Sequence, residues 1–195
     1  YKLQKSHLEI EDGPILVTGA TGGVGSMAIA MLAKTGYEVV AATGKIDQTD
    51  SLKKLGASKI IHRDEVRDDG DRPLLSGRWS GAVETVGGPI LDTVIRSAKH
   101  NGVITCCGNV LSHELQTNVY PFILRGVHLL GIDSGICKMP FRKKVWQKMA
   151  NEYKPDMLDT IATPVKLSDL ETEIQKILEG GHVGRKYVVM KSDLG

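Results

Sequence analysis

Residues 15–25 read ILVTGATGGVG, an apolar run that breaks into glycines, and the helical pattern of Ser26–Lys34 follows directly. This order predicts a buried strand, a tight turn and a helix. Gly22 leaves room for a pyrophosphate to approach the backbone, Gly25 allows close helix packing, and the helix N-terminus attracts phosphate. The usual fingerprint is G-x-G-x-x-G, and Ala20 stands here in place of its first glycine. Because a strand and a helix flank the turn, a dinucleotide site is favoured over a merely glycine-rich turn.

Strands and helices keep alternating after this first unit. Further strands are predicted at Glu38–Thr43, Lys59–His62, Ala82–Val86, Gly102–Cys107 and Val127–Ile132. The helices between them are predicted at Asp50–Leu55, Ile90–Ser97 and, as a short turn, Tyr120–Leu124. We therefore expect an α/β fold, a doubly wound parallel six-stranded sheet of the Rossmann type, with the strand order 3-2-1-4-5-6.

The chain divides into three expected parts. Residues 1–14 have the pattern of a helix end and a lead-in, and residues 15–153 are expected to form the dinucleotide-binding Rossmann domain. Residues 154–195 are expected to add a helix at Asp169–Leu178 and a final strand at Lys186–Met190, which would return to a substrate domain.

The central part is predicted to end in a helix at Phe141–Tyr153. Its Trp146, Met149 and Tyr153 have the spacing of a stripe that faces the core. A ligand role for this stripe is not expected.

The composition excludes several classes of protein. The chain has 195 residues with 25 Lys and Arg against 23 Asp and Glu, and without a basic block it is not expected to bind nucleic acid. No apolar run approaches the roughly 20 residues that cross a bilayer and no signal peptide is found, so we expect a cytoplasmic protein with no membrane partner. The 3 cysteines fit reduced thiols, and the 6 histidines, without C-x-x-C or H-x-x-H spacing, predict no metal site.

In a sheet of this order, ligands lie beyond the carboxyl ends of the strands. After the second strand, where an NAD enzyme usually carries an acid, the chain has Thr43, Gly44 and Lys45. Lys45 could pair with a 2′-phosphate and the Thr43 hydroxyl could donate to it, which favours NADPH. Asp47 weakens this interpretation, and the alternative is that Lys45 is an ordinary solvated lysine. Arg63, just past the third strand, is a second candidate at the adenine end.

The fifth and sixth strands end in residues that are expected near a nicotinamide ring. Cys107, Gly108 and Asn109 follow the fifth strand, and Asp133 and Ser134 follow the sixth. Cys107 has no base near it in sequence, so it is interpreted as a packing residue and not as a nucleophile. The full set predicted to bind the cofactor is Gly22, Gly23, Val24, Thr43, Lys45, Arg63, Val86, Cys107, Gly108, Asn109, Ile132, Asp133 and Ser134.

Several of these stretches resemble a known family. The chain is similar to the cofactor-binding part of the zinc-independent medium-chain dehydrogenase/reductases, in the quinone oxidoreductase group, through TGATGGVG at 18–25, Leu55–Ala57, Glu84–Gly88 and Cys107–Asn109. Within that group it resembles the NADPH-dependent acrylyl-CoA reductases through PFILRGV at 121–127, LGIDS at 130–134 and Gly184-Arg185.

The resemblance implies an NADPH-dependent reductase that reduces the C=C bond of a conjugated carbonyl compound, with an enoyl-CoA, an enone or a quinone as the small-molecule substrate. Members of the family begin with a GroES-like substrate domain, which is expected to be absent from this chain. The chain departs from the acrylyl-CoA reductase branch at Glu84, where Asp is common, and at Lys45, where Arg is common. No catalytic residue is identifiable, so an NADPH-binding sensor or regulatory module without catalysis stays open as an alternative.

The sixth strand, Val127–Ile132, is an edge of the expected sheet and contains no Lys or Pro. Because such an edge invites pairing, a homodimer is expected in which the same strand of a second chain adds antiparallel to it. The alternative is that the tail after Ser134, or the substrate domain, covers this edge.

Overall fold

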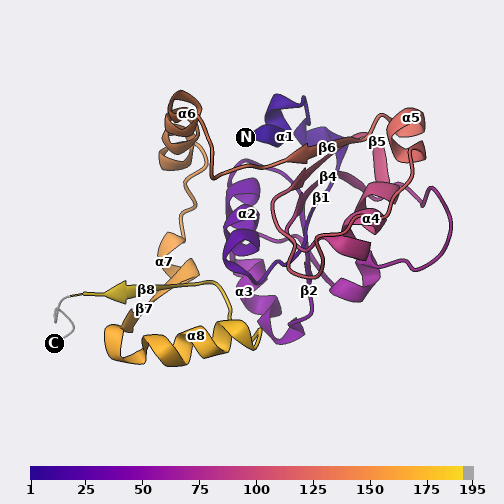
Figure 1. The fold of residues 1–195 in the computed structure, drawn as a ribbon. Helices are drawn as coiled ribbons and strands as arrows, with labels where there is room; N and C mark the ends of the chain where they lie inside the picture. The colour runs from indigo at the N-terminus through magenta and orange to yellow at the C-terminus, as the bar shows by residue number, and fades with distance from the viewer. Residues whose placement is uncertain (191–195) are drawn as a thin grey trace.

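The computed structural model describes residues 1–190, and six strands form its main parallel sheet. The strands are β1 (Ile15–Val17), β2 (Val39–Thr43), β3 (Lys59–His62), β4 (Trp79–Glu84), β5 (Ala98–Cys106) and β6 (His128–Gly131). Their order is β3-β2-β1-β4-β5-β6, which confirms the prediction (Figure 1). Because the order reverses between β1 and β4, a crevice opens at the carboxyl ends of these strands, in the middle of the sheet.

The central strands are buried on both faces. Every residue of β1 and β2 is buried. In β1, Leu16 belongs to the core on one face of the sheet, and Val17 to the core on the other. Such strands read as continuous apolar runs, which is the signal that predicted them. Each fully buried aliphatic side chain of this kind contributes roughly 1.5–3 kcal/mol to folding.

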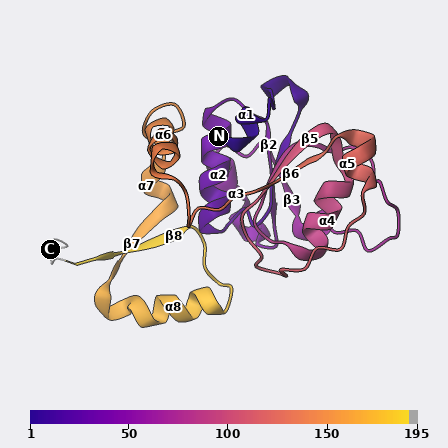
Figure 2. The same ribbon diagram turned by 45° about the horizontal axis from the view of Figure 1, so that its top comes forward.

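Helices cover both faces of the sheet. α2 (Gly23–Lys34) and α3 (Thr49–Lys54) lie on one face, and α4 (Gly88–Arg96) and α5 (Tyr120–Arg125) lie on the other (Figures 1 and 2). Ile29 and Leu52 pack the first face, and Val94 and Ile95 pack the second. α1 (Lys2–Lys5) lies on the α2 side, where Leu3 is buried. Short 3-10 helices occur at Ile10–Asp12, Ile46–Gln48, Arg63–Val66 and Leu167–Asp169. No helix within residues 1–190 is long and apolar enough to cross a membrane.

The fourth strand begins earlier and ends earlier than predicted. It runs over Trp79–Glu84 instead of Ala82–Val86. Trp79 is buried, and its indole N–H donates to Ser97 Oγ at 3.1 Å, which anchors the start of the strand. The strand stops at Glu84 because the next residues turn into the loop that leads to α4.

A second, smaller unit follows the main sheet. It consists of α6 (Met139–Ala150), α7 (Leu158–Ile161), β7 (Ala162–Lys166), α8 (Leu170–Leu178) and β8 (Arg185–Val189). β7 and β8 pair in parallel as a separate two-stranded sheet, in which Pro164 stands opposite Tyr187. The sequence did not predict β7 because Pro164 interrupts it, and proline is tolerated at a sheet edge.

The stripe predicted on α6 does not face the core of the sheet. Trp146 is 61% exposed, so the prediction is wrong for this residue, whereas Tyr153 is buried. The spacing predicted the helix correctly, but α6 has no buried residue of its own because it stands away from the sheet. Trp146, Met149 and Tyr153 line a cavity instead.

Candidate functional site

The turn that joins β1 to α2 brings backbone close to backbone. Gly19 has a positive φ of +57°, and a Cβ at this position would lie 2.4 Å from Thr85 Oγ1. A Cβ at Gly25 would lie 2.3 Å from the carbonyl oxygen of Gly19, so only glycine fits there. The close packing predicted for Gly25 is therefore confirmed, although its nearest neighbours are Gly19 and Ala20 of the turn and not the strand.

α2 presents its N-terminus to the crevice. The helix begins at Gly23 and not at Ser26, because Gly22 is an extended N-cap with φ −76° and ψ 169°. No side chain among residues 1–190 caps this end, and Val24 of the first turn is half exposed. The first N–H groups of the helix and its positive dipole end therefore remain available to an anion.

A segment from the far end of the chain crosses this turn. We call it the crossing segment, and it comprises His182–Arg185. The backbone N–H of Gly184 donates to the carbonyl oxygen of Thr21 at 2.9 Å, and Nε of Arg185 donates to the carbonyl oxygen of Gly23 at 3.1 Å. Arg185 therefore adds a positive charge beside the N-terminus of α2. The sequence analysis did not assign Arg185 to the site, and its only signal was the resemblance carried by Gly184-Arg185.

Two predicted cations lie together after β2 and β3. Lys45 donates from Nζ to the carbonyl oxygen of His182, so the crossing segment reaches this end of the site as well. The guanidinium of Arg63 lies against Gly44, where a Cβ would be 3.0 Å from Arg63 Nε. Both positive groups therefore flank the turn at which the ribose of a dinucleotide is expected.

The Thr43 hydroxyl is held inside the turn. It accepts the backbone N–H of Lys45 at 3.0 Å and lies 3.3 Å from Thr21 Oγ1, and the residue is buried. Asp47, which weakened the phosphate interpretation, is exposed and accepts a hydrogen bond from Gln48 at 2.7 Å.

The ends of β5 and β6 form a shallow hollow on the other side of the crevice. It is lined by Cys106, Cys107, Gly108, Asn109, Gly131, Ile132 and Asp133. The structure thus brings together five of the residues that were predicted to bind the cofactor, Cys107, Gly108, Asn109, Ile132 and Asp133. Ser134 is not among those that line the hollow, and Val86 lies beside the glycine turn, with Cγ2 3.6 Å from a Cβ built on Gly19.

The polar groups of this hollow carry little reactivity. Burial raises the pKa of the Cys107 thiol, and the neighbouring Cys106 and Glu84 act in the same direction. The thiolate is therefore disfavoured, which agrees with the expectation that Cys107 is not a nucleophile. The residue is exposed, however, so its interpretation as a packing residue is wrong. The Asp133 carboxylate accepts the backbone N–H groups of Gly135 and Ile136, so it stabilises its own turn.

Glu84, at the end of β4, is a completely buried carboxylate. Its Oε1 accepts hydrogen bonds from Thr18 Oγ1 at 3.1 Å, Val86 N at 2.8 Å and Gly87 N at 3.0 Å. Burial raises the pKa of this carboxyl, and the hydrogen bonds oppose that rise. The sequence analysis noted Glu84 only as a departure from a motif, because the partners of a side chain at a strand end are set by the loops around it.

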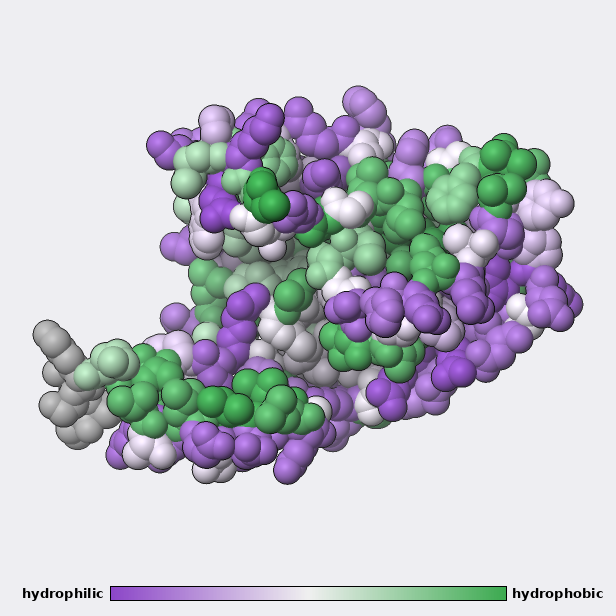
Figure 3. All heavy atoms as spheres, viewed as in Figure 1, coloured by the Kyte–Doolittle hydropathy of each residue, from purple (hydrophilic) through white to green (hydrophobic). Residues whose placement is uncertain are grey.

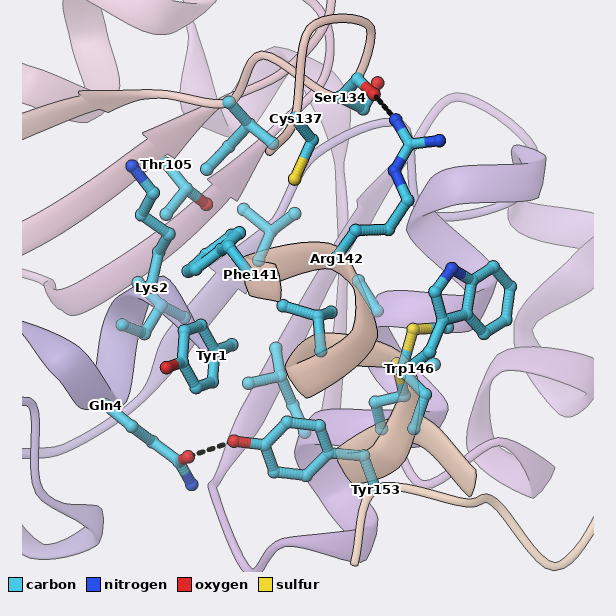
Figure 4. A pocket seen from close by; sticks show the side chains of 18 of the residues that line it. Tyr1, Lys2, Gln4, Thr105, Ser134, Cys137, Phe141, Arg142, Trp146 and Tyr153 are labelled. Carbon is cyan, nitrogen blue, oxygen red and sulfur yellow. Dashed lines mark hydrogen bonds between the residues drawn. The ribbon is translucent and has the colours of Figure 1, made fainter. Parts of the chain in front are cut away.

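A cavity of about 950 Å³ lies between α1, α2 and α6 (Figure 4). The rings of Tyr1 and Phe141 meet edge to face inside it at 5.3 Å, and Tyr153 is hydrogen-bonded to Gln4. Arg142 is turned to the rim, where it donates to the carbonyl oxygen of Ser134 at 2.7 Å. The lining is mostly apolar, and three of the residues predicted to bind the cofactor, Ile132, Asp133 and Ser134, belong to it.

The crevice is suited to hold a dinucleotide. It offers backbone N–H groups, three cations (Lys45, Arg63 and Arg185) and a hollow of small residues, which match phosphates at one end and an uncharged ring at the other. Among residues 1–190, no group of three or more His, Cys, Asp and Glu side chains is placed to hold a metal ion.

Comparison with known proteins agrees with this arrangement. The family model described as zinc-binding dehydrogenase matches residues 23–152. The chain is 43% identical over 189 residues to the putative quinone oxidoreductase YhfP of Bacillus subtilis, covering 96% of this chain and 57% of that protein. It is 43% identical over 176 residues to the acrylyl-CoA reductase AcuI of Ruegeria pomeroyi, covering 90% of this chain and 53% of the relative. The chain therefore spans little more than half the length of these relatives.

Two solved structures also superpose closely on this chain. The Bacillus subtilis protein yhfP with NAD bound superposes with a TM-score of 0.93 at 43% identity, over 97% of this chain and 58% of the other. The yhdH oxidoreductase from Salmonella enterica in complex with NADP superposes with a TM-score of 0.93 at 36% identity, with the same coverage of 97% and 58%.

Proposed function

The chain belongs to the zinc-binding dehydrogenase family, in its zinc-independent group, and we propose that it is the NADPH-binding part of a reductase that acts on the C=C bond of a conjugated carbonyl compound. The observation that carries this proposal is that Lys45 and Arg63 flank the same turn after β2, with the crossing segment running from Lys45 to the open N-terminus of α2. A single anion would need one of these sites, whereas a dinucleotide with a 2′-phosphate needs both.

The pyrophosphate is assigned to the N-terminus of α2. Gly22, Gly23 and Val24 offer the backbone there, and Arg185 adds a charge at the carbonyl oxygen of Gly23. A helix N-terminus and an arginine act together on a phosphate, because the first supplies N–H donors and the second a forked cation.

The 2′-phosphate is assigned to Lys45 and Arg63. No carboxylate follows β2 directly, and the nearest one, Asp47, is paired with Gln48. The Thr43 hydroxyl, which has partners inside the turn, is assigned a supporting role through the backbone of Lys45. Relatives differ in this respect, since one solved structure holds NAD and another, from Escherichia coli K-12, holds NADPH.

The nicotinamide ring is assigned to the hollow of Cys107, Gly108, Asn109, Ile132 and Asp133. Val86, which lies beside the glycine turn, and Ser134, which follows Asp133 in the chain, stay predicted cofactor residues. Bound NADPH supplies a hydride. The residues of this chain hold and orient the ring, so that one face is turned toward the substrate. An acrylyl-CoA-like substrate is proposed because relatives bear that name, and a quinone is the second candidate because of YhfP.

The C-terminal unit is proposed to pack against a substrate domain of the longer protein. Its apolar side chains are left uncovered, with Leu167 59%, Leu178 73% and Tyr187 52% exposed. Figure 3 shows a hydrophobic band along α8 and the two-stranded sheet. Such a band favours burial against another part of the protein. The predicted boundary between the Rossmann domain at residues 15–153 and the C-terminal part at residues 154–195 stays a prediction.

A second function, an NADPH-binding sensor or regulatory module without catalysis, is kept because no acid and base converge at the crevice among residues 1–190. The test is a comparison of NADPH oxidation by the full-length protein with acrylyl-CoA, a quinone and a simple enone. Fast oxidation with acrylyl-CoA supports the first proposal, and fast oxidation only with the quinone moves the substrate class to quinones. Tight NADPH binding without oxidation by any of the three favours the sensor.

A further inference from the structure

The buried Glu84 does not itself line the hollow at the ends of β5 and β6, yet its carboxylate joins segments that surround the crevice. Thr18, which donates to it, directly follows β1 and leads into the glycine turn. Val86 and Gly87, whose N–H groups it accepts, form the loop after β4. One side chain therefore ties the loops of the two strands between which the crevice opens.

The Val86–Gly87 loop is in turn hydrogen-bonded to the loop that follows β5. The carbonyl oxygen of Val86 accepts the backbone N–H of Leu111 at 2.8 Å, and Gly87 pairs with Ser112 in a short parallel bridge. The backbone of Glu84 itself accepts the N–H of Cys107 at 3.0 Å. The loop that carries Cys107, Gly108 and Asn109 is thus held by the same residue and its immediate neighbours.

The site needs the oxygen atoms of this side chain and not its bulk. Without an acceptor, the N–H groups of Val86 and Gly87 would be buried without partners, which backbone groups avoid by moving. Thr18 would also lose its acceptor, although its oxygen would still accept the N–H of Thr85 at 2.9 Å. The first consequence of losing Glu84 is therefore a shift of the Val86–Gly87 loop.

We propose that Glu84 is a positioning residue, which acts as a hydrogen-bond acceptor to fix the Val86–Gly87 loop and so holds the nicotinamide half of the cofactor. The inference rests on the proposed binding of NADPH. It concerns only the nicotinamide half, because the ribose turn and the N-terminus of α2 lie on other loops. An amide at this position would keep Oε1 as an acceptor, whereas a thioether of similar length would not.

The experiment compares Glu84→Met with Glu84→Gln. Affinity is measured for NADPH and for 2′-phospho-ADP-ribose, which lacks the nicotinamide. Glu84→Met is expected to weaken NADPH binding about tenfold or more and 2′-phospho-ADP-ribose binding less than about threefold, whereas Glu84→Gln keeps both within about threefold. Ser80→Ala is the matched control, because Ser80 is also buried in β4 but donates to Gly13 and Pro14 at the opposite end of the strand. It is expected to leave both affinities unchanged.

Several results would overturn the proposal. Equal losses of both ligands in Glu84→Met, or no loss of either, would remove the link to the nicotinamide half. If Glu84→Met and Glu84→Gln weakened NADPH binding equally, the negative charge of Glu84 would matter and not its role as a hydrogen-bond acceptor. A wild-type chain that binds neither ligand would overturn the proposed function itself, and this inference with it. That result is distinguishable from the others, because they concern only the variants. If Glu84→Met does not fold, Thr18→Val removes a donor of the same network and is expected to weaken NADPH selectively, while unchanged NADPH binding in that variant would overturn the proposal.

Discussion

Nε of Arg185 donates a hydrogen bond to the carbonyl oxygen of Gly23 at 3.1 Å, although 162 positions separate the two residues. The start of β8 and the start of α2 therefore form one edge of the crevice. At this edge the guanidinium lies beside the N-terminus of α2, which no side chain among residues 1–190 caps. A residue of the small C-terminal unit thus lies at the candidate cofactor site.

Arg185→Ala is expected to weaken NADPH and NADH binding alike, by about tenfold, because both cofactors have the pyrophosphate that this charge faces and a charge-assisted contact contributes about 1.5–3 kcal/mol. Fluorescence titration with each cofactor measures it. Lys186→Ala is the control, since Lys186 is the next cation on β8 and lies 3.8 Å from Glu173, away from the crevice. A loss confined to NADPH would contradict the assignment to the pyrophosphate.

Lys45→Ala is expected to lower NADPH affinity at least about tenfold and NADH affinity little, because only NADPH has the 2′-phosphate. The same titrations measure the ratio of the two affinities. Lys53→Ala, which removes an exposed lysine of α3, serves as the control for general charge. If both cofactors weaken together, or if the wild type prefers NADH, the phosphate role of Lys45 is wrong.

Gly22→Val is expected to fold and to lose cofactor affinity by several kcal/mol, because the branched side chain occupies the space that the phosphates need. A Cβ at Gly22 meets only the carbonyl oxygen of Gly19, at 3.2 Å, so the turn accommodates it with a small shift. Circular dichroism checks the fold, and titration with NADPH measures the loss. Wild-type affinity in this variant would exclude a pyrophosphate at the turn.

Glu84 gives folding stability a defined pH dependence. Its pKa is raised by burial above the ordinary value of 4.5, so the folded protein holds this proton more tightly than the unfolded chain does. The stability that this group contributes is present below pH 4.5 and is lost as the pH rises through the folded pKa. Urea unfolding of the wild type and Glu84→Gln over a pH series is expected to show the wild type losing stability relative to the variant in that window. A constant difference between the two proteins would contradict this expectation.

Leu129→Pro is expected to convert a dimer into a monomer with an intact cofactor site. The N–H of Ile132 points to β5, where it donates to Cys106 at 2.9 Å. Because successive residues of a strand point to opposite neighbours, the N–H of Leu129 points to the free edge of β6. Proline there removes a donor from that edge, and Leu129→Ala, which keeps the donor, is the matched control. Sedimentation at protein concentrations of tens of micromolar measures the oligomeric state of each protein. A monomeric wild type, or a Leu129→Pro variant that still dimerises, would overturn the prediction of a dimer through β6.

The central strands β1 and β2 were predictable because they are buried on both faces, which leaves an uninterrupted apolar signal in the sequence. β3 was predicted to the residue. β7 was missed because Pro164 hides a strand that pairs along one edge only. The exposure of Trp146 was missed because a helical period marks an apolar face without saying what that face meets.

Some residues of the candidate site could be predicted from the sequence and others could not. Residues directly after strands, such as Lys45 and Asn109, were predictable because parallel strands bring their carboxyl ends to one edge. Arg185 was not, since its place depends on how a separate two-stranded sheet folds back. Glu84 was recognised as unusual, but its hydrogen bonds depend on the path of the loop after it.

The hydrogen bonds of the crossing segment set an order of events during synthesis. A ribosome that adds about 5–20 residues per second needs roughly 8–32 s to make the 162 positions between Gly23 and Arg185. All six strands of the main sheet have left the ribosome before that time ends, so a nascent chain can assemble its sheet while the arginine of the site is still unmade. A molecule clipped before residue 185 would retain the parallel sheet and the glycine turn but bind its cofactor weakly. Retention on an immobilised nucleotide would therefore separate chains that were translated through β8 from those that stopped short of it.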